Sequence, residues 1–283
     1  MSSPGSDFGA DYGALPAGVE RVLAPNPSVM TGAGTNTFLV ADEAGGAVVV
    51  IDPGPDIPDH LRRIADEVGR RGAAQAILVT HGHPDHAEGA AALRALLGVP
   101  VYAWSREGVP AMDNALADDE IVPVGARRLR ALYTPGHRFD HLCFLLEDSG
   151  ALFAGDLIAG EGTVVIAPPE GDLLAYMASL RRLRALHPRL ILPAHGPLLD
   201  QPGAVLDYYI AHRDEREQQV LAALAAGPQP IMELVRIVYA EVNPDLHPLA
   251  AQSLLAHLQK LERERRVHRE MDAAGAEQWS LGA

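Results

Sequence analysis

The sequence predicts a layered α/β domain followed by a small helical domain. Apolar strand patterns alternate with amphipathic helix patterns up to about residue 203, and the composition then shifts to helical segments that end in a hairpin pattern. The chain has 283 residues, enough for one large core and one small one. We therefore predict a large domain at residues 1–203 and a C-terminal domain at residues 204–283.

The elements of the large domain follow from apolar periodicity. Apolar runs bounded by turn residues predict strands at 35–41, 47–52, 76–80, 129–133, 142–146, 152–154 and 190–193. Helical spacing of apolar residues predicts helices at 59–69, 87–97 and 173–186. The first two dozen residues show no sustained period and are predicted to form a loose lead-in, and a turn is predicted at 42–46.

The C-terminal domain shows the element order of a winged helix. Helices are predicted at 205–226, 231–240 and 249–264, followed by strands at 266–270 and 277–281 around a turn at 273–275. From Val205 onward the chain has 8 Lys/Arg and 12 Asp/Glu, a net charge of −4, which is not the basic footprint of a nucleic-acid binder. The local basic cluster from Lys260 to Arg269 is interpreted as a solvated helix end, with RNA binding, dimerisation and a covering role left open.

Composition excludes several classes of protein. The net charge of −14 disfavours a protein that wraps a polyanion. Cys143 is the only cysteine, so no intrachain disulfide is expected. No apolar stretch approaches the roughly 20 residues of a membrane helix. Residues 1–13 lack the basic and apolar regions of a secretory signal, so the predicted compartment is the cytoplasm.

The densest cluster of candidate ligands is Thr80-His81-Gly82-His83-Pro84-Asp85-His86. Because alternate residues at a strand end point the same way, His81 and His83 can reach one cation. Asp85 and His86 open the next predicted helix and face a second cation. Imidazole and carboxylate are ligands that zinc accepts. The spacing therefore predicts a metal site rather than an exposed loop with fortuitous histidines.

Three further candidates, His137, Asp156 and His195, each follow a predicted strand and stand beside a glycine. A lone histidine at a strand end is usually structural or exposed. The shared position of the three makes them candidate ligands as a set. The loop at 160–163 is predicted to form a rim of the site, and Glu161 is expected to be simply exposed, with a role in selectivity as the alternative.

Taken in order, His-x-His-x-Asp-His, Thr-Pro-Gly-His, Ala-Gly-Asp and a late Ala-His-Gly resemble the metallo-β-lactamase superfamily over residues 35–196. The resemblance implies a four-layer αββα sandwich with metals at the edge between two sheets. It implies that His81, His83 and His137 hold one metal. Asp85, His86 and His195 would hold the other, and Asp156 would bridge both. Asp52 matches the early aspartate that supports such a site without binding metal.

A closer resemblance lies in Gly-Thr-Asn-Thr at 34–37 and in the segment 212–219 before the winged helix. Both are similar to the lactamase-like-protein-2 subfamily, which includes mitochondrial single-strand endoribonucleases, bacterial hydrolases and fungal acyl-carrier thioesterases. Two positions depart from the wider pattern. Arg138 stands where many members have a small hydroxyl residue, and Asp156 stands where clinically familiar lactamases have a cysteine. β-Lactams are therefore disfavoured as the main substrate.

The resemblance implies two Zn²⁺ ions, with iron or manganese as alternatives, that share a bridging hydroxide. Asp85 is predicted to orient this hydroxide and carry its proton, and His141 either supports the site or is an ordinary strand histidine. The predicted function is hydrolysis of an ester, thioester or phosphodiester. The alternatives are a single-strand endoribonuclease and a mononuclear-iron persulfide dioxygenase on the same scaffold. The expected partners are a small ester or thioester, or single-stranded RNA, with no membrane and a possible second copy of the chain.

Overall fold

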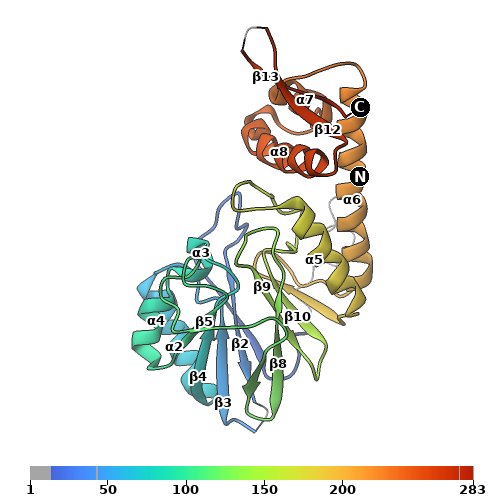
Figure 1. The fold of residues 1–283 in the computed structure, drawn as a ribbon. Coiled ribbons are helices and arrows are strands. Elements are labelled where there is room, and N and C mark those ends of the chain that lie inside the picture. Colours follow the sequence, from blue (N-terminus) through green and yellow to red (C-terminus); the bar gives the residue numbers. More distant parts are fainter. Residues whose placement is uncertain (1–13, 43, 274, 283) are drawn as a thin grey trace. The chain divides into compact units, whose positions relative to one another are not determined.

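The computed structural model describes residues 14–42, 44–273 and 275–282 (Figure 1). The predicted lead-in at 1–13, and residues 43 and 274 of the two predicted turns, lie outside the described residues. The chain divides into two compact units. The first comprises the described parts of 1–134, 140–164 and 182–205, and the second comprises 135–139, 165–181 and the described part of 206–283.

The first sheet of the first unit has six strands in chain order: β1 (Val19–Leu23), β2 (Asn36–Ala41), β3 (Ala47–Ile51), β4 (Ala73–Leu78), β5 (Val101–Ala103) and β6 (Asn114–Ala115). Strands β1 to β3 pair antiparallel and β3 to β6 pair parallel. The parallel strands need crossovers, which include α2 (Pro58–Arg71) and α4 (Ala90–Leu97). Leu61, Ile64 and Leu93 of these helices pack on one face of the sheet with Val48 and Ile77.

The second sheet has the order β11-β10-β9-β8-β7, with β7 (Ile121–Val124), β8 (Arg127–Tyr133), β9 (Leu142–Leu146), β10 (Ala151–Gly155) and β11 (Leu190–Pro193). Helix α5 (Leu173–Ala185) lies between β10 and β11 in the chain, and these two strands pair parallel. The inner faces of the two sheets share one core, in which the Phe38 and Phe153 rings meet edge to face at 5.2 Å. The first unit is therefore a β-sandwich, and it carries all of the candidate ligands except His137, which belongs to the second unit.

The C-terminal part of the second unit contains α6 (Pro202–Leu224, which begins in the first unit), α7 (Ile231–Val238), a 3₁₀ turn (Pro244–Leu246), α8 (His247–Arg263), β12 (Val267–Met271) and β13 (Glu277–Leu281). Its core is formed by apolar side chains of all three helices around the buried Trp279. The predicted order of three helices and a hairpin is confirmed.

Three expectations about the elements were wrong. Strand β1 occupies part of the predicted loose lead-in, because it pairs with β2 rather than following a pattern of its own. Strands β5 to β7 were not predicted. The single helix predicted at 87–97 is two helices, α3 (Pro84–Ala87) and α4, because Gly89 N donates to Gly54 O instead of continuing a helix.

Among the described residues, we find no helix with the length and apolar character needed to cross a bilayer.

Candidate metal centre

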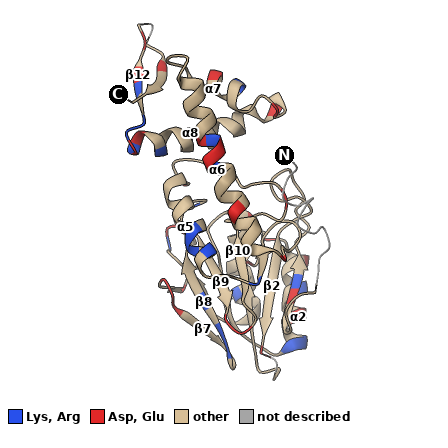
Figure 2. Ribbon diagram, turned by 90° about the vertical axis from the view of Figure 1, so that its right-hand side faces the viewer, with Lys and Arg blue, Asp and Glu red and all other residues tan. Residues whose placement is uncertain are grey.

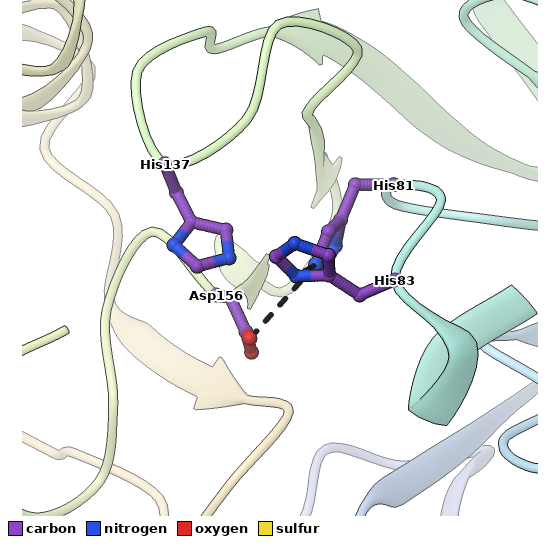
Figure 3. A group of neighbouring side chains, drawn as sticks. All are labelled: His81, His83, His137 and Asp156. Atoms are coloured by element: carbon purple, nitrogen blue, oxygen red, sulfur yellow. Dashed lines mark hydrogen bonds and ion pairs between the residues drawn. The ribbon is translucent and has the colours of Figure 1, made fainter. Parts of the chain in front are cut away.

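The candidate ligands form two groups, each with its ligand atoms within 4.8 Å of one another. One group is His81, His83, His137 and Asp156, and the other is Asp85, His86 and His195. Figure 3 shows the side chains of the first group turned toward one another, with a dashed line from His81 to Asp156. All seven residues predicted as ligands are thus brought together in groups that could each hold a cation.

Asp156 faces both groups with different oxygens. Its Oδ1 lies 3.2 Å from His195 Nε2 and 3.4 Å from His86 Nε2. Its Oδ2 lies 3.9 Å from His81 Nε2. Asp85 Oδ2 lies on the second group's side, 3.2 Å from His195 Nε2 and 3.4 Å from His86 Nε2. A carboxylate with one oxygen toward each group is the arrangement that a pair of neighbouring cations requires.

Asp52, which the sequence led us to expect as a support of the site, contacts His86 at Nδ1. The carboxylate is 2% exposed and accepts hydrogen bonds from Thr80 N (2.7 Å) and Thr80 Oγ1 (2.8 Å). Its Oδ2 lies 2.8 Å from His86 Nδ1. Asp52 has φ 53°, a conformation that L residues adopt at a cost, so the surrounding contacts impose it. With Nδ1 engaged by Asp52, only Nε2 of His86 faces the site.

The hydrogen bonding of His86 shows, without reference to the sequence motif, whether a cation fits here. His86 is fully buried, and its Nε2 has no hydrogen-bond partner although two carboxylates face it at 3.4 Å. Buried ring nitrogens in native proteins are normally satisfied. A divalent cation between His86 Nε2 and these carboxylates would satisfy all three groups. The residues therefore fit a dinuclear metal site.

The loop that carries His195 is fastened by the Gly-Thr-Asn-Thr segment. Asn36 Nδ2 donates to Pro193 O and Gly196 O, both at 3.0 Å, and Asn36 N donates to Ala194 O at 2.7 Å. One residue further on, Thr37 Oγ1 donates to Asp52 O at 2.6 Å. From the sequence, this segment resembled a subfamily, but its structural role could not be predicted. The residues that it contacts, at 193–196, lie about 160 residues away in the chain.

His141 lies behind Asp156 and has both ring nitrogens engaged. The backbone N–H of Asp156 donates to His141 Nε2 at 3.1 Å. Nδ1, which must then carry the proton, lies 3.0 Å from Thr134 Oγ1. Gly155 makes room for this contact, because a Cβ there would lie 2.6 Å from His141 Nε2. The contact places His141 in a position to fix the Asp156 main chain.

Asp140 is a supporting residue that the sequence did not indicate. It is 1% exposed, and its Oδ2 accepts a hydrogen bond from Gly82 N at 3.0 Å, in the middle of the His-x-His loop. Arg138, the unusual residue after His137, is also buried and lies 3.4 Å from Glu170. An aspartate one residue before a histidine has no distinctive spacing, so only the tertiary contact reveals its partner.

Opposite charges outweigh burial at the centre. Burial acts to lower the pKa of His195, but the Asp156 carboxylate raises it to about 9. Burial acts to raise the pKa of Asp156, but the charges of His86 and His195 hold it well below its ordinary value. Burial likewise opposes ionisation of Asp85, whose pKa is lowered by the neighbouring imidazoles of His195 and His86. The carboxylates are therefore anionic, and cation binding must displace protons from the imidazoles.

A pocket of about 360 Å³ lies against His195. Its lining is Val29, Met30, Thr31, Gly32, Ala159, Glu161, Gly162, His195 and Gly196. Val29 and Met30 are 86% and 58% exposed, on a turn in which Ser28 Oγ accepts from Met30 N and Thr31 N. A built turn that presents two large apolar side chains beside a candidate ligand is a feature that the sequence alone did not reveal.

Comparisons with known proteins agree with this architecture. Residues 30–195 match the family model described as the metallo-beta-lactamase superfamily, and residues 231–279 match the beta-lactamase associated winged helix domain. The chain is 35% identical over 272 residues to the beta-lactamase-like protein 2 homolog of Drosophila melanogaster, covering 88% of this chain and 89% of that protein.

Solved structures show the same fold. A beta-lactamase domain protein from Burkholderia ambifaria superposes with a TM-score of 0.80 at 23% identity, over 99% of this chain and 97% of its own. TTHA1623 in a di-iron-bound form superposes with a TM-score of 0.53 at 27% identity, over 65% of this chain and 96% of its own. These matches confirm the predicted fold class and the C-terminal winged helix.

Proposed function

The chain belongs to the metallo-β-lactamase superfamily of hydrolytic enzymes, and on this premise we propose that it is a dizinc hydrolase of carboxylic esters or thioesters. The substrate carries an apolar group beside the scissile carbonyl. The position of Asp156, with one oxygen toward each ligand group, is the observation that carries the dinuclear part of the proposal.

In this proposal, His81, His83 and His137 hold one cation. Asp85, His86 and His195 hold the other, and Asp156 contributes to both. Two bound divalent ions would supply Lewis acidity toward the substrate oxygen and a water that ionises near neutral pH. Imidazole and carboxylate also suit iron, and the similar TTHA1623 was solved in a di-iron-bound form, so iron is the alternative metal.

Asp85 has the position and charge to orient the attacking water. Its carboxylate is partly exposed, unlike that of Asp52, and its pKa is lowered by His195 and His86 after the opposing effect of burial. Its Oδ2 lies beside the two imidazoles of its own group. We infer that Asp85 stays ionised and orients the attacking water by accepting a hydrogen bond from it at this carboxylate.

The pocket beside His195 supports a carbonyl substrate with an apolar group. Val29 and Met30 offer apolar surface within reach of a group whose reacting carbon sits at the metals. Burial of such a group gains binding energy at about 25 cal/mol per Å² of apolar surface. Glu161 in the same lining would repel an anionic strand but not an acyl chain.

The charges of the C-terminal helices disfavour the endoribonuclease alternative. Within the basic cluster, Lys260 and Arg266 both contact Glu217, Arg263 contacts Asp172, and Arg269 contacts Glu277. Figure 2 shows basic and acidic residues mixed along this region rather than a continuous basic face. Cations already paired with carboxylates offer little net charge to a phosphate backbone.

The proposal is tested by measuring metal content and activity on the same preparation. We expect zinc in the purified protein, hydrolysis of a chromogenic thioester that chelation abolishes and zinc restores, and no cleavage of single-stranded RNA. Cleavage of RNA without thioester hydrolysis would replace the carbonyl substrate by a phosphodiester. A single iron with neither activity would move the protein to the oxygenase class.

The apolar pocket is tested by Met30→Ser. We expect KM for a long-chain acyl thioester to rise about threefold to tenfold while KM for an acetyl thioester stays within about twofold, because only the long chain buries surface against Met30. Leu96→Ser is the matched control, since Leu96 is 54% exposed on α4 and lies outside the pocket lining. If Met30→Ser left KM for the long-chain thioester at the wild-type value, the pocket would be removed from the proposal.

A further inference from the structure

The loop that carries His137 is held by the segment 165–179. Asp172 N donates to Gly136 O at 2.8 Å, and Ser179 Oγ donates to Pro135 O at 2.7 Å. His137 Nδ1 lies 3.1 Å from Val165 O, so Nε2 is the nitrogen that it would offer to a cation. The position of His137 therefore depends on where the start of α5 lies.

The loop that carries His137 packs closely against α5. Gly136 has φ 140°, and a Cβ at this position would lie 2.2 Å from Tyr176 Cα. Tyr176 is fully buried, and the Arg213 guanidinium of α6 lies 5.4 Å from the centre of its ring. A shift of the first turn of α5 must therefore move the backbone next to His137.

The first turn of α5 is in turn tied to the winged helix. Asp172 Oδ1 accepts a hydrogen bond from Ala175 N at 3.0 Å and so caps α5. Its other oxygen accepts from Arg263 Nη1, at the C-terminal end of α8, at 2.6 Å. A continuous path of two contacts thus runs from Arg263 through Asp172 to Gly136, the residue directly before His137.

We propose that Arg263 of the winged helix is a positioning residue for the metal ligand His137, acting through Asp172. This inference rests on the proposed function, because it takes His137 as a ligand. It gives the C-terminal domain a role in the hydrolase that requires neither RNA nor a second copy of the chain. The pair is partly exposed, at 47% for Arg263 and 38% for Asp172, so its effect is moderate.

The test compares Arg263→Gln with a matched control, Arg236→Gln. Arg236 is an exposed arginine of the same domain, and its ion pair with Glu233 lies within α7. In Arg263→Gln we expect amide hydrogen exchange of residues 136–139 to quicken about twofold to fivefold. We expect one of the bound metal ions to dissociate faster by a similar factor in a competition with a weak chelator. Arg263→Lys should restore both rates in part, and Arg236→Gln should change neither.

A double-mutant cycle with Asp172→Asn shows whether Arg263 acts through Asp172. Asparagine still caps a helix but loses the charge that Arg263 contacts. The two substitutions together should therefore do no more than either alone. Unchanged exchange at 136–139 in Arg263→Gln would overturn the proposal. If the wild type bound no metal, the proposed function would fail, and the exchange rates would still decide whether Arg263 controls the loop.

Discussion

The two ligand groups differ in what holds their side chains. In the group of Asp85, His86 and His195, buried side chains close to the ligands do the holding: Asp52 contacts His86, and Asn36 fastens the His195 loop. In the group of His81, His83, His137 and Asp156, the support is more distributed. His137 depends on main-chain contacts with residues 165–172, and Asp156 on its backbone contact with His141.

Two neighbouring candidate cation sites can therefore differ in how firmly the surrounding residues hold their ligands. A ligand fixed by a buried carboxylate is preorganised, so cation binding costs little rearrangement there. A ligand on a loop that is fixed through a helix end depends on the stability of that helix. We therefore expect the cation of the Asp85 group to be retained longer, and that of the His137 group to respond to changes in the winged helix.

The largest expected effect comes from removing one ligand of each group. His86→Ala and His137→Ala should each reduce kcat/KM for the thioester by about 10³-fold, because the attacking water loses one of its two cations. Each variant should retain about one metal ion. Steady-state kinetics combined with metal analysis check this, and activity near the wild-type level in either variant would mean that its group is dispensable.

A smaller effect is expected at Asp52. Asp52→Asn keeps the shape of the side chain but weakens the contact that orients His86, so affinity for one cation should fall about tenfold to a hundredfold. The other cation should be affected less, because Asp52 is joined to its ligand His81 through Thr80 Oγ1, which lies 2.8 Å from Asp52 Oδ2 and 3.0 Å from His81 Nδ1. Isothermal titration with zinc measures both affinities. Equal weakening of the two would show that the groups are not independently supported.

Asn36→Ala should act on the same group to a lesser degree. Loss of the two donations to Pro193 O and Gly196 O leaves acceptors at the His195 loop without their donor, at a cost of about 1–3 kcal/mol. We expect a lower Tm together with weaker metal retention. Asn114→Ala, in the exposed strand β6, serves as the control. If Asn36→Ala lowered Tm but left metal retention unchanged, Asn36 would support the fold only.

The smallest expected effect is on the stability of the C-terminal domain and does not involve either ligand group. His257 of α8 is buried with neither ring nitrogen hydrogen-bonded. Burial, reinforced by the charges of Arg213 and Lys260, holds its pKa well below the ordinary value of 6.5. His212 behaves alike, with a pKa of about 4 caused first by burial and then by Arg213.

Because the unfolded chain binds protons near pH 6.5 and the folded one does not, stability contributed by these histidines is lost as pH falls from about 6.5 toward 4. His257→Leu should raise Tm by a few degrees at pH 7.5, since it removes an unsatisfied buried ring worth about 1 kcal/mol, and by more at pH 5. Calorimetry at both pH values checks this. A lower Tm at both would mean that the ring has an unrecognised partner.

The candidate ligands could be predicted from the sequence because their chemistry is concentrated. His81 to His86 stand within six positions, and His137, Asp156 and His195 each follow an apolar run. Their supports could not be predicted, because the contacts join distant parts of the chain: Asn36 reaches Pro193, and Asp140 reaches Gly82. Strand β1 was not predicted for the same reason, because its pairing with β2 favours the strand more than its own residue pattern does.

We propose that the two differently supported groups each hold one cation. The decisive measurement is the metal content per chain of gently purified wild type, His86→Ala and His137→Ala. We expect about two ions per chain in the wild type and about one in each variant. A single ion in the wild type, unchanged by one of the two substitutions, would mean that the two groups do not each hold a cation.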